Sequence, residues 1–247
     1  MVKIIFSDFD ETMLNYHSNK NYFDNYQIAV LKKVKEAGIK FGIVTGRPVD
    51  FFDQFPNILP YVDYILSSNG ACIYDMSSKK FIYQKFMKKD SVLLLYDYIK
   101  KHDMDMYYNS FGKQIYNEKI VNYDTCEQLI LSFKDYLLED VLDDIKEIPD
   151  VSYNNICRHG DRYTVDVDDD GVSKGNAVEY LCNYLKIDKD DTICFGDSDN
   201  DVSMFSSVGK SISVSNGTDR IRTLANKITL SSAENGIFKY IDEFILK

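Results

Sequence analysis

Histidine, cysteine and proline are scarce in this chain, and the few that occur form no recognisable site. The three histidines lie far apart without a metal-ligand spacing, so a histidine-based active site is not expected. The five cysteines are scattered, odd in number and lack a Cys-x-x-Cys pair, which argues for reduced packing residues and against a zinc or redox site. The four prolines form no Pro-rich linker, and there is no repeat or low-complexity tract.

Long apolar runs and an excess of basic residues are also missing. The longest apolar stretches are short and strand-like, whereas a membrane helix needs about 20 residues. Asp8 and Asp10 interrupt any secretory signal, so we expect a cytoplasmic protein with no membrane partner. Lys and Arg total 29 against 39 Asp and Glu, and the net charge of −10 opposes nucleic-acid binding. The 247 residues suffice for one large domain or a domain with a sizeable insertion.

Strand-like and helix-like segments alternate in both terminal parts of the chain. Short β-branched and aromatic runs predict strands at 2–6, 39–44, 62–66, 192–195, 211–214 and 227–230. Apolar residues at helical spacing predict helices at 27–37, 174–185, 218–225 and 234–246. This alternation predicts an α/β fold in which helices cover both faces of a parallel sheet.

The middle of the chain, from about Phe81 to Asp168, has a different order of predicted strands and helices. A hairpin turn is expected at 77–80. Paired strands are expected at 104–111 with 114–117 and at 153–158 with 163–167, and helices at 91–101 and 126–138. The sequence therefore predicts an α+β insertion with both ends of the host domain outside it.

Two carboxylates follow the first predicted strand, in Asp8-Phe9-Asp10-Glu11-Thr12. Open α/β sheets bind ligands at the carboxyl ends of their strands, so Asp8 and Asp10 are expected at the ligand-binding edge. Residues two apart on an extended segment point the same way, and converging carboxylates repel unless a cation or a proton lies between them. Mg²⁺ is the natural candidate, and the alternative is a pair of solvated turn aspartates.

Further polar segments fall at or near the same edge, and each also has an ordinary structural explanation. Thr45 and Gly46 could hold phosphate oxygens, or Thr45 could be a plain N-cap before Pro48. The segment 68–71 could be only a turn. Lys174 in a first helical turn suits a bound anion, although most lysines are simply solvated. The segment 196–201 brings more carboxylates, of which Asp199 could be a surface cap.

Taken together and in order, these segments resemble the haloacid dehalogenase (HAD) superfamily. Its phosphatases carry Asp-x-Asp-x-Thr, a strand-end Ser or Thr, a Lys and Gly-Asp-x-x-x-Asp, which correspond here to 8–12, Thr45, Lys174 and 196–201. Segments 45–48, 68–71, 172–175 and 200–201 are further similar to the Cof-type subfamily, which dephosphorylates small phosphorylated metabolites. Two residues depart from the subfamily pattern: Glu11 replaces a usual glycine, and Gly217 stands where Asn-Ala is frequent.

The resemblance implies a domain organisation and a set of residue roles. A Rossmann-like core would comprise 1–80 and 169–247, and 81–168 would form a C2-type cap. Asp8 would be the nucleophile that becomes an aspartyl-phosphate, and Asp10 the general acid and base. Mg²⁺ would be held by Asp8, the Asp10 carbonyl, Asp197 and Asp201. Phosphoryl oxygens would bind the Phe9 amide, Thr45, Gly46, Lys174 and Asn200.

The expected substrate is a small phosphomonoester such as a sugar phosphate, selected by the cap. Arg158 and Arg162, which flank the turn with His159 and Asp161, are the first candidates for its contacts, because guanidinium groups pair with oxyanions. Tyr107, Tyr108 and Asn109 are the second candidates. A phosphosugar mutase and a catalytically silent metabolite-binding regulator are the alternative functions. The sequence identifies neither the metabolite nor the oligomeric state.

Overall fold

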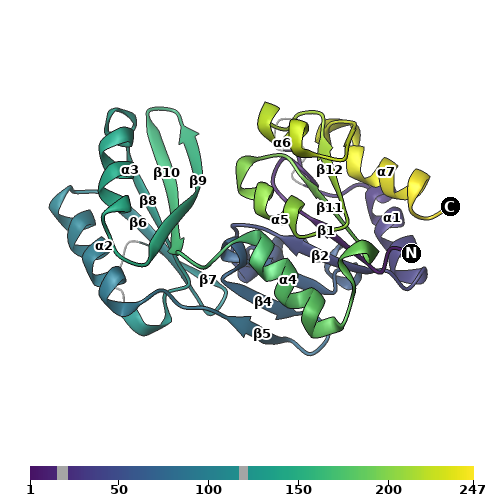
Figure 1. Cartoon of the computed structure of the whole chain (residues 1–247), viewed down its shortest axis with the longest axis horizontal. Coiled ribbons are helices and arrows are strands. Elements are labelled where there is room, and N and C mark those ends of the chain that lie inside the picture. The colour runs from purple at the N-terminus through teal and green to yellow at the C-terminus, as the bar shows by residue number, and fades with distance from the viewer. Residues whose placement is uncertain (16–21, 117–121) are drawn as a thin grey trace.

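The protein is built from two lobes, each with its own β-sheet (Figure 1). The structure is a computed structural model and describes residues 1–15, 22–116 and 122–247. The first sheet comprises β1 (Ile4–Ser7), β2 (Lys40–Val44), β3 (Tyr64–Ser67), β4 (Cys72–Asp75), β5 (Lys80–Gln84), β11 (Thr192–Gly196), β12 (Lys210–Val214) and β13 (Lys227–Thr229). Its order is β13-β12-β11-β1-β2-β3-β4-β5, parallel up to β3 and antiparallel from β3 to β5.

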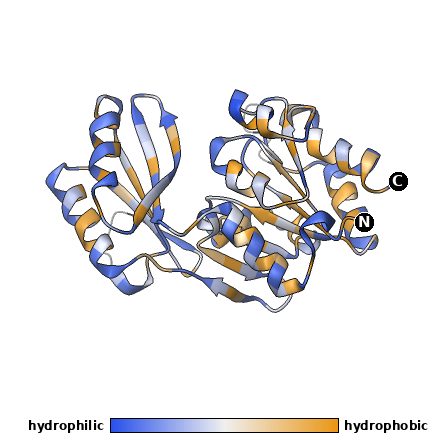
Figure 2. Cartoon of the chain, in the orientation of Figure 1, coloured by the Kyte–Doolittle hydropathy of each residue, from blue (hydrophilic) through white to orange (hydrophobic). Residues whose placement is uncertain are grey.

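Helices cover both faces of this first sheet. Neighbouring residues of β1 point to opposite faces, so Ile5 packs with α1 (Asn25–Glu36) and α7 (Gly236–Phe244). Ile4 and Phe6 pack with α4 (Lys174–Leu185), α5 (Val202–Ser206) and α6 (Asp219–Leu224). Figure 2 shows apolar residues concentrated along these strands. The α/β class predicted from the sequence is confirmed.

The second sheet is antiparallel, with the order β7-β6-β8-β10-β9. Its strands are β6 (Asp105–Ser110), β7 (Lys113–Tyr116), β8 (Gln128–Lys134), β9 (Val151–His159) and β10 (Arg162–Asp169). Helices α2 (Lys89–Lys101) and α3 (Leu138–Lys146) cover the face that is turned away from the first lobe (Figure 1). The opposite face carries the alternate residues of each strand and is turned toward the first lobe.

The predicted helix at 126–138 is wrong. Residues 128–134 form β8, and the helix α3 begins only at Leu138. Leu129, Leu131 and Phe133 pack under the two helices, whereas Ile130 lies on the opposite face of the sheet. Ile130 interrupts the alternation of apolar and polar residues that identifies a strand, and Leu, Glu and Gln are good helix formers. The local pattern therefore resembles that of a helix. Pairing with β6 and β10 on both sides overrides that preference.

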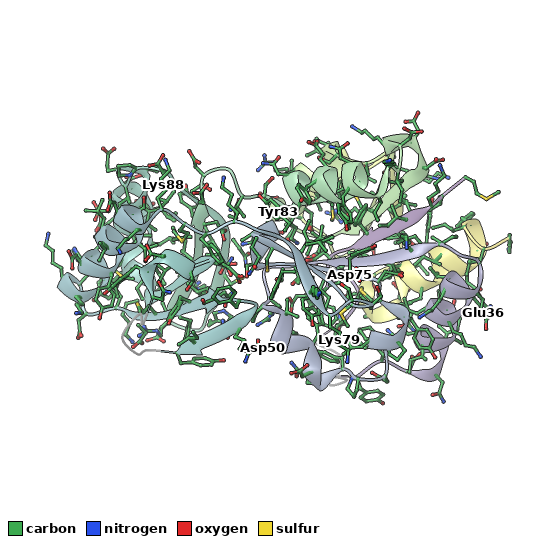
Figure 3. All side chains as sticks on the ribbon, turned by 90° about the horizontal axis from the view of Figure 1, so that it is seen from below. Glu36, Asp50, Asp75, Lys79, Tyr83 and Lys88 are labelled. Carbon is green, nitrogen blue, oxygen red and sulfur yellow. The ribbon has the colours of Figure 1, made fainter. Side chains whose placement is uncertain are left out.

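The chain crosses between the lobes after β5 and again after β10. Seen from below in Figure 3, Asp75 lies in one lobe, Tyr83 near the junction and Lys88 in the other lobe. The predicted boundary between core and cap at 80/81 falls inside β5, and the boundary at 168/169 falls just before the last residue of β10. The division into domains stays a prediction. Asn117 of the predicted strand 114–117, and also His17, lie outside the described residues.

Several short 3₁₀ segments connect the main elements. They are η2 (Val49–Gln54), η3 (Leu59–Tyr61), η4 (Ser68–Gly70), η5 (Tyr123–Thr125), η6 (Asp135–Leu137), η7 (Lys189–Asp191), η8 (Asp199–Asp201) and η9 (Ser232–Glu234). Within the described ranges, no helix is both long enough and apolar enough to cross a bilayer.

Candidate active site

The carboxyl ends of three neighbouring parallel strands bring the predicted site together. Asp8 follows β1, Thr45 follows β2 and Asp197 follows β11, and these strands lie side by side in the order β11-β1-β2. The Asp8 amide donates to the carbonyl of Phe195, 2.9 Å away, which extends the β1–β11 pairing up to the site. The ends of a parallel sheet therefore gather residues that are far apart in the sequence.

Lys174 joins two buried carboxylates at this edge. Its Nζ lies 2.6 Å from Asp8 Oδ1 and 2.6 Å from Asp201 Oδ1. The lysine is 1% exposed, Asp201 0% and Asp8 5%. Burial alone lowers the pKa of Lys174, but the two carboxylates outweigh it and hold this pKa above its ordinary value, so the ammonium stays charged. Loss of Lys174 would leave the two buried carboxylates without their counter-charge, at a cost of roughly 3–5 kcal/mol.

Asp8, Asp197 and Asp201 form an acidic cluster that fits a divalent cation. One oxygen from each lies within 4.8 Å of the others. Burial, assisted by the charge of Asp201, raises the pKa of Asp197 to about 7. Burial also raises the pKa of Asp8, against the opposing charge of Lys174. Three carboxylates face one lysine, so a hard, oxygen-seeking cation such as Mg²⁺ would neutralise the excess negative charge.

Backbone and hydroxyl groups fix the orientation of this cluster. Asp201 Oδ2 accepts hydrogen bonds from the amides of Asp197 (2.9 Å) and Ser198 (3.1 Å). The hydroxyl of Thr12 donates to Asp197 Oδ1 at 2.8 Å, which explains the threonine of the Asp-x-Asp-x-Thr motif. Ser173 caps α4 by accepting from the Asn176 amide, so the helix begins where Lys174 must point inward.

Asp10 turns toward Arg47 rather than toward the buried cluster. Arg47 Nη2 lies 3.0 Å from Asp10 Oδ1, and Nε lies 3.1 Å from Asp10 Oδ2. The guanidinium also lies over the ring of Phe51, 4.7 Å from its centroid. Sequence analysis gave Arg47 no role, although its position after β2 places it at the same edge as Thr45.

The predicted phosphate-binding residues lie around Asp8. Thr45 is fully buried, and its Oγ1 accepts from the Arg47 amide at 3.1 Å. A Cβ on Gly46 would come within 3.1 Å of Asn69 Oδ1 and Asp166 Oδ2, so a larger residue would crowd this loop. Asn200 lines the cavity over Asp8, and its Oδ1 accepts from the Ser198 hydroxyl at 2.8 Å. The ring of Phe9 is buried in the core, which leaves only its backbone for a ligand.

The two departures from the motif pattern occupy constrained positions. Glu11 has φ +57°, in the left-handed region that glycine adopts without strain. Its carbonyl accepts from Asn216 Nδ2 at 2.9 Å, and Asn15 Nδ2 donates to its carboxylate at 3.2 Å. A Cβ on Gly217 would lie 2.8 Å from Ser213 Oγ, so the tight packing there suits glycine.

A cavity of about 410 Å³ separates the acidic cluster from the second lobe. On the first-lobe side it is lined by Asp8, Asp10, Arg47, Asp197 and Asn200, among others. The wall from the second lobe includes Tyr107, Gln114, Ile130, Asn155, Ile156 and Thr164. All of them except Ile156, which pairs with the core residue Val165 on the edge strand β9, lie on the open face of the antiparallel sheet, so this face forms most of the roof of the site.

Arg158 and Arg162 do not line this cavity, although His159 between them does. Arg158 Nη2 lies 2.9 Å from Asp135 Oδ2, and Arg162 Nη2 lies 2.7 Å from Asp105 Oδ2. Asp161 pairs with Lys134 at 2.5 Å. Of the second group of candidates, Tyr107 lines the cavity, whereas Tyr108 and Asn109 are buried. A role of the two arginines in substrate choice stays a prediction.

Sequence analysis also missed a buried polar network that joins the lobes. Asn69 Nδ2 of the first lobe donates to Asp166 Oδ2 (3.2 Å) and Asp168 Oδ2 (3.1 Å) of β10. Asp168 accepts further bonds from Asn154 at 2.8 Å and Gln128 at 3.0 Å. Burial raises the pKa of Asp166 to about 6 and, with the charge of Asp166, that of Asp168 to about 7. In the sequence, segment 68–71 marked one end of this network, and at the other end the only signal was the alternation of Asp166, Val167 and Asp168.

The sequence and the fold were compared with those of known proteins. The sequence model of the haloacid dehalogenase-like hydrolase family matches residues 5–136 and 103–241. A 5-amino-6-(5-phospho-D-ribitylamino)uracil phosphatase of Bacillus subtilis is 22% identical over 248 residues, which cover 99% of this chain and 96% of the relative.

Solved structures share the whole fold at low sequence identity. A phosphatase of the HAD superfamily from Bacteroides thetaiotaomicron has a TM-score of 0.83 at 19% identity and covers 100% of this chain and 96% of its own. A sugar phosphatase of HAD subclass IIB has a TM-score of 0.81 at 18% identity, with 100% of both chains covered. The likeness therefore includes the two-lobed architecture on which the site depends.

Proposed function

We propose that this chain, which belongs to the haloacid dehalogenase-like hydrolases, uses Mg²⁺ and an aspartyl-phosphate at Asp8 to hydrolyse a small phosphorylated metabolite. The chain is a phosphoric monoester hydrolase of this family. A sugar phosphate or a related polyhydroxylated phosphomonoester is the substrate we favour. Residues 81–168 would act as the cap, and a cytoplasmic location stays a prediction.

The observation that carries this proposal is the buried cluster of Asp8, Lys174, Asp197 and Asp201. A purely structural ion pair would balance its charges, whereas this cluster has three carboxylates around one ammonium. It also lies beneath a cavity at the carboxyl edge of a parallel sheet, where such folds bind ligands. When bound, Mg²⁺ would neutralise negative charge on the phosphoryl oxygens and on the attacking carboxylate.

In the first step, an oxygen of the Asp8 carboxylate attacks phosphorus while the bond to the leaving oxygen breaks. Asp10 gives its proton to the leaving alkoxide, so the alcohol departs neutral. The 2.6 Å contact with Lys174 lowers the pKa of Asp8 against the larger effect of burial, and so favours the ionised form that attacks. The bidentate contact with Arg47 holds Asp10 at the rim of the cavity, outside the cluster that positions Asp8.

In the second step, water replaces the alcohol. The Asp10 carboxylate removes a proton from water as the water oxygen attacks the phosphorus of the aspartyl-phosphate. The bond from phosphorus to Asp8 breaks, which releases inorganic phosphate and restores both aspartates. A mutase would differ only in the acceptor, because a second sugar hydroxyl would take the place of water.

Phosphate release from a panel of phosphomonoesters tests this function. We expect Asp8→Asn, which keeps the shape of the side chain but removes the nucleophile, to lose at least about 1,000-fold in kcat, since nucleophile and base act as a unit. EDTA should abolish turnover, and added Mg²⁺ should restore it. Turnover of Asp8→Asn at the parent rate, or resistance to EDTA, would refute the mechanism. Transfer to a sugar hydroxyl in place of net phosphate release would support the mutase.

A further inference from the structure

A buried carboxylate in the roof of the cavity lacks a basic partner within the described part of the chain. Asp166, from β10, lines the cavity over Asp8 and is 8% exposed. Its donors are two neutral amides, Asn69 at 3.2 Å and Asn155 at 3.3 Å, and no described lysine or arginine forms an ion pair with it. A buried carboxylate without a counter-charge is costly, so its position in the cavity wall indicates a ligand that supplies the charge.

One oxygen of Asp166 is left for this ligand. Both amides donate to Oδ2, and no described residue donates to Oδ1. Asn69 turns its nitrogen to the carboxylates of β10, and its buried Oδ1 accepts no hydrogen bond from a described residue. A Cβ on Gly46 would lie 3.1 Å from this Oδ1 and 3.1 Å from Asp166 Oδ2. Acceptor oxygens therefore face one point in front of Gly46, which suits a ligand that donates hydrogen bonds.

Asp168, two residues further along β10, is a carboxylate with structural contacts instead. It is 0% exposed and does not line the cavity. Amides of Asn69, Asn154 and Gln128 donate to it and reach both of its oxygens. Asp166 has fewer donors, keeps one oxygen for the cavity and lies in its wall. The difference indicates that Asp166 serves a ligand as well as the contact between the lobes.

The charge balance of the cavity favours a positively charged leaving group. When its groups are ionised, the acidic cluster around Lys174 carries two net negative charges, which one Mg²⁺ would offset. Asp10 is paired with Arg47. A phosphoryl group adds about 1.5–2 negative charges at neutral pH. The carboxylate of Asp166 adds to these charges, so a second anionic group on the substrate would be repelled and a cationic group attracted.

An ammonium group fits this position better than a hydroxyl group. A hydroxyl would donate one hydrogen bond and leave the charge of Asp166 uncompensated. An ammonium has three N–H donors and supplies the counter-charge, and charge-assisted hydrogen bonds are about twice as strong as neutral ones. Burial raises the pKa of Asp166 only to about 6, because its two amide donors and the nearby basic groups oppose the rise. The carboxylate is therefore mostly ionised at pH 7.

We propose that Asp166 is a specificity-determining residue that binds an ammonium group of the leaving group, so that the preferred substrate is the phosphomonoester of an amino alcohol. This inference rests on the proposed function and specifies its leaving group. Gly46 belongs to the loop expected to bind phosphoryl oxygens, so the ammonium lies within a few bonds of the phosphate ester. Oδ1 of Asn69 faces the same position and adds the negative end of an amide dipole.

Substrates that differ in this one group test the proposal. 2-Aminoethyl phosphate, 2-hydroxyethyl phosphate and phosphoglycolate end a two-carbon chain with an ammonium, a hydroxyl and a carboxylate, and the 3-aminopropyl and 3-hydroxypropyl esters extend the reach by one carbon. At pH 7 we expect kcat/KM to be about ten-fold higher for the amine than for the alcohol in at least one pair, since one charge-assisted hydrogen bond corresponds to about that factor. Phosphoglycolate should be the poorest substrate. Equal values for amine and alcohol in both pairs would overturn the proposal.

Asp166→Asn keeps the size of the side chain and removes its charge. We expect the amine-to-alcohol ratio of kcat/KM to fall about ten-fold and the discrimination against phosphoglycolate to weaken, because an amide does not repel a carboxylate as a second carboxylate does. Damage to the fold would instead lower all activities together. Differences in intrinsic reactivity between the esters are the same for both proteins and cancel in this comparison. Losses of equal size on all the esters would contradict the assignment of Asp166.

Asp168→Asn is the matched control. It removes a buried carboxylate from the same strand and the same amide network, and its side chain does not line the cavity. We expect this variant to keep the amine-to-alcohol ratio of the parent. A ratio that falls equally in both variants would mean that selectivity follows the contact between the lobes, and the ammonium site would be wrong.

A binding measurement separates failure of this proposal from failure of the proposed function. Isothermal titration calorimetry of the Asp8→Asn protein with Mg²⁺ gives dissociation constants for both amine and alcohol pairs without turnover. We expect the amine to bind about ten-fold more tightly in at least one pair, and this difference to disappear when Asp166→Asn is added. Equal binding of amine and alcohol refutes the ammonium site even if the parent is an active phosphatase. A preference that depends on Asp166, in a parent without phosphatase activity, would refute only the proposed function.

Discussion

At the scale of single residues, Glu11 shows how one backbone angle bears on the site. Its φ of +57° places a non-glycine residue in the left-handed region directly after Asp10. Contact between Cβ and the following carbonyl costs such a residue about 1–2 kcal/mol. The carbonyl of Glu11 is nevertheless fixed by Asn216, so the turn keeps the shape that presents Asp10 to the cavity.

We predict that Glu11→Gly is more stable than Glu11→Ala by about 1 kcal/mol. Both variants lose the side-chain hydrogen bond to Asn15, so the alanine variant is the control for that loss. Only the glycine variant also relieves the backbone. Urea unfolding gives the two free energies, and equal values would show that the turn is not strained by a Cβ.

The protonation of Asp168 makes a second prediction. Burial, with the charge of Asp166, raises the pKa of Asp168 to about 7, so the folded state keeps a proton that the unfolded chain loses near its ordinary value. The free energy of unfolding should therefore fall as the pH rises across this window. Asp168→Asn removes this titration, and the stability of the parent relative to the variant should fall by on the order of 2 kcal/mol between pH 5 and 8.

Chemical unfolding of both proteins at pH 5, 6, 7 and 8 in EDTA measures that difference. The chelator keeps the acidic cluster in the same metal-free state in both proteins. A difference that stays constant with pH would show that Asp168 is ionised over the whole range. Its three amide partners would then stabilise a carboxylate rather than a carboxylic acid.

Asp10 gives a third prediction, which concerns proton transfer. A sugar alkoxide is a poor leaving group and needs a proton, whereas an activated aryl oxide needs little help. Asp10→Asn should therefore lower kcat by roughly 100-fold or more for a sugar phosphate and by much less for p-nitrophenyl phosphate. Equal losses would indicate that Asp10 serves the metal site or the contact with Arg47.

At the scale of secondary structure, the elements predicted correctly are those where several local signals agree, such as a capping residue and a regular spacing of apolar residues. The helix α4 was predicted with its observed ends, because Ser173 caps it and apolar residues recur at helical spacing. The strands β1, β2 and β11 were recognisable as short apolar runs followed by polar loops. The strands β4 and β5, at one end of the same sheet, were predicted only as a hairpin turn, because mixed polar and aromatic residues hide their alternation.

The strand β8 shows why part of the second lobe was not predictable. Six of its seven residues are buried, one set under α2 and α3 and the other set against polar partners or the cavity. Burial on both faces removes the alternation that identifies a half-buried strand. Ile130, which lines the roof of the cavity, was therefore assigned to a helix that does not exist.

At the scale of the whole molecule, the features that the sequence did not predict depend on contacts between segments that are far apart along the chain. The catalytic candidates were predictable, because each lies at the end of a strand and all such ends share one edge. The network of Asn69 with Asp166 and Asp168 was not, since about a hundred residues separate the partners and no motif links them.

The last prediction concerns this contact between the lobes. Asn69→Gly keeps the backbone relaxed, because Asn69 has φ +55°, but it removes the donor shared by two buried carboxylates. Each carboxylate keeps another amide donor, Asn155 for Asp166 and Asn154 for Asp168. The cost is therefore that of two lost hydrogen bonds at about 0.5–1.5 kcal/mol each, and we expect a loss of about 1–3 kcal/mol in unfolding free energy. Hydrogen exchange should rise in β10 and in 68–71.

Asn235→Gly is the matched control, with φ +60° at a helix start and side-chain contacts to Gln27 and Asp24 within the first lobe only. It should cost less than about 1 kcal/mol and leave exchange in β10 unchanged, since a glycine replaces an N-cap asparagine at little cost. Equal losses of unfolding free energy in the two variants would mean that Asn69 contributes no more than an ordinary turn residue. A selective loss at Asn69 would mean that this residue holds the loop after β2 and the roof of the cavity in register, because its backbone N–H donates to the carbonyl of Thr45 and its side chain donates to β10.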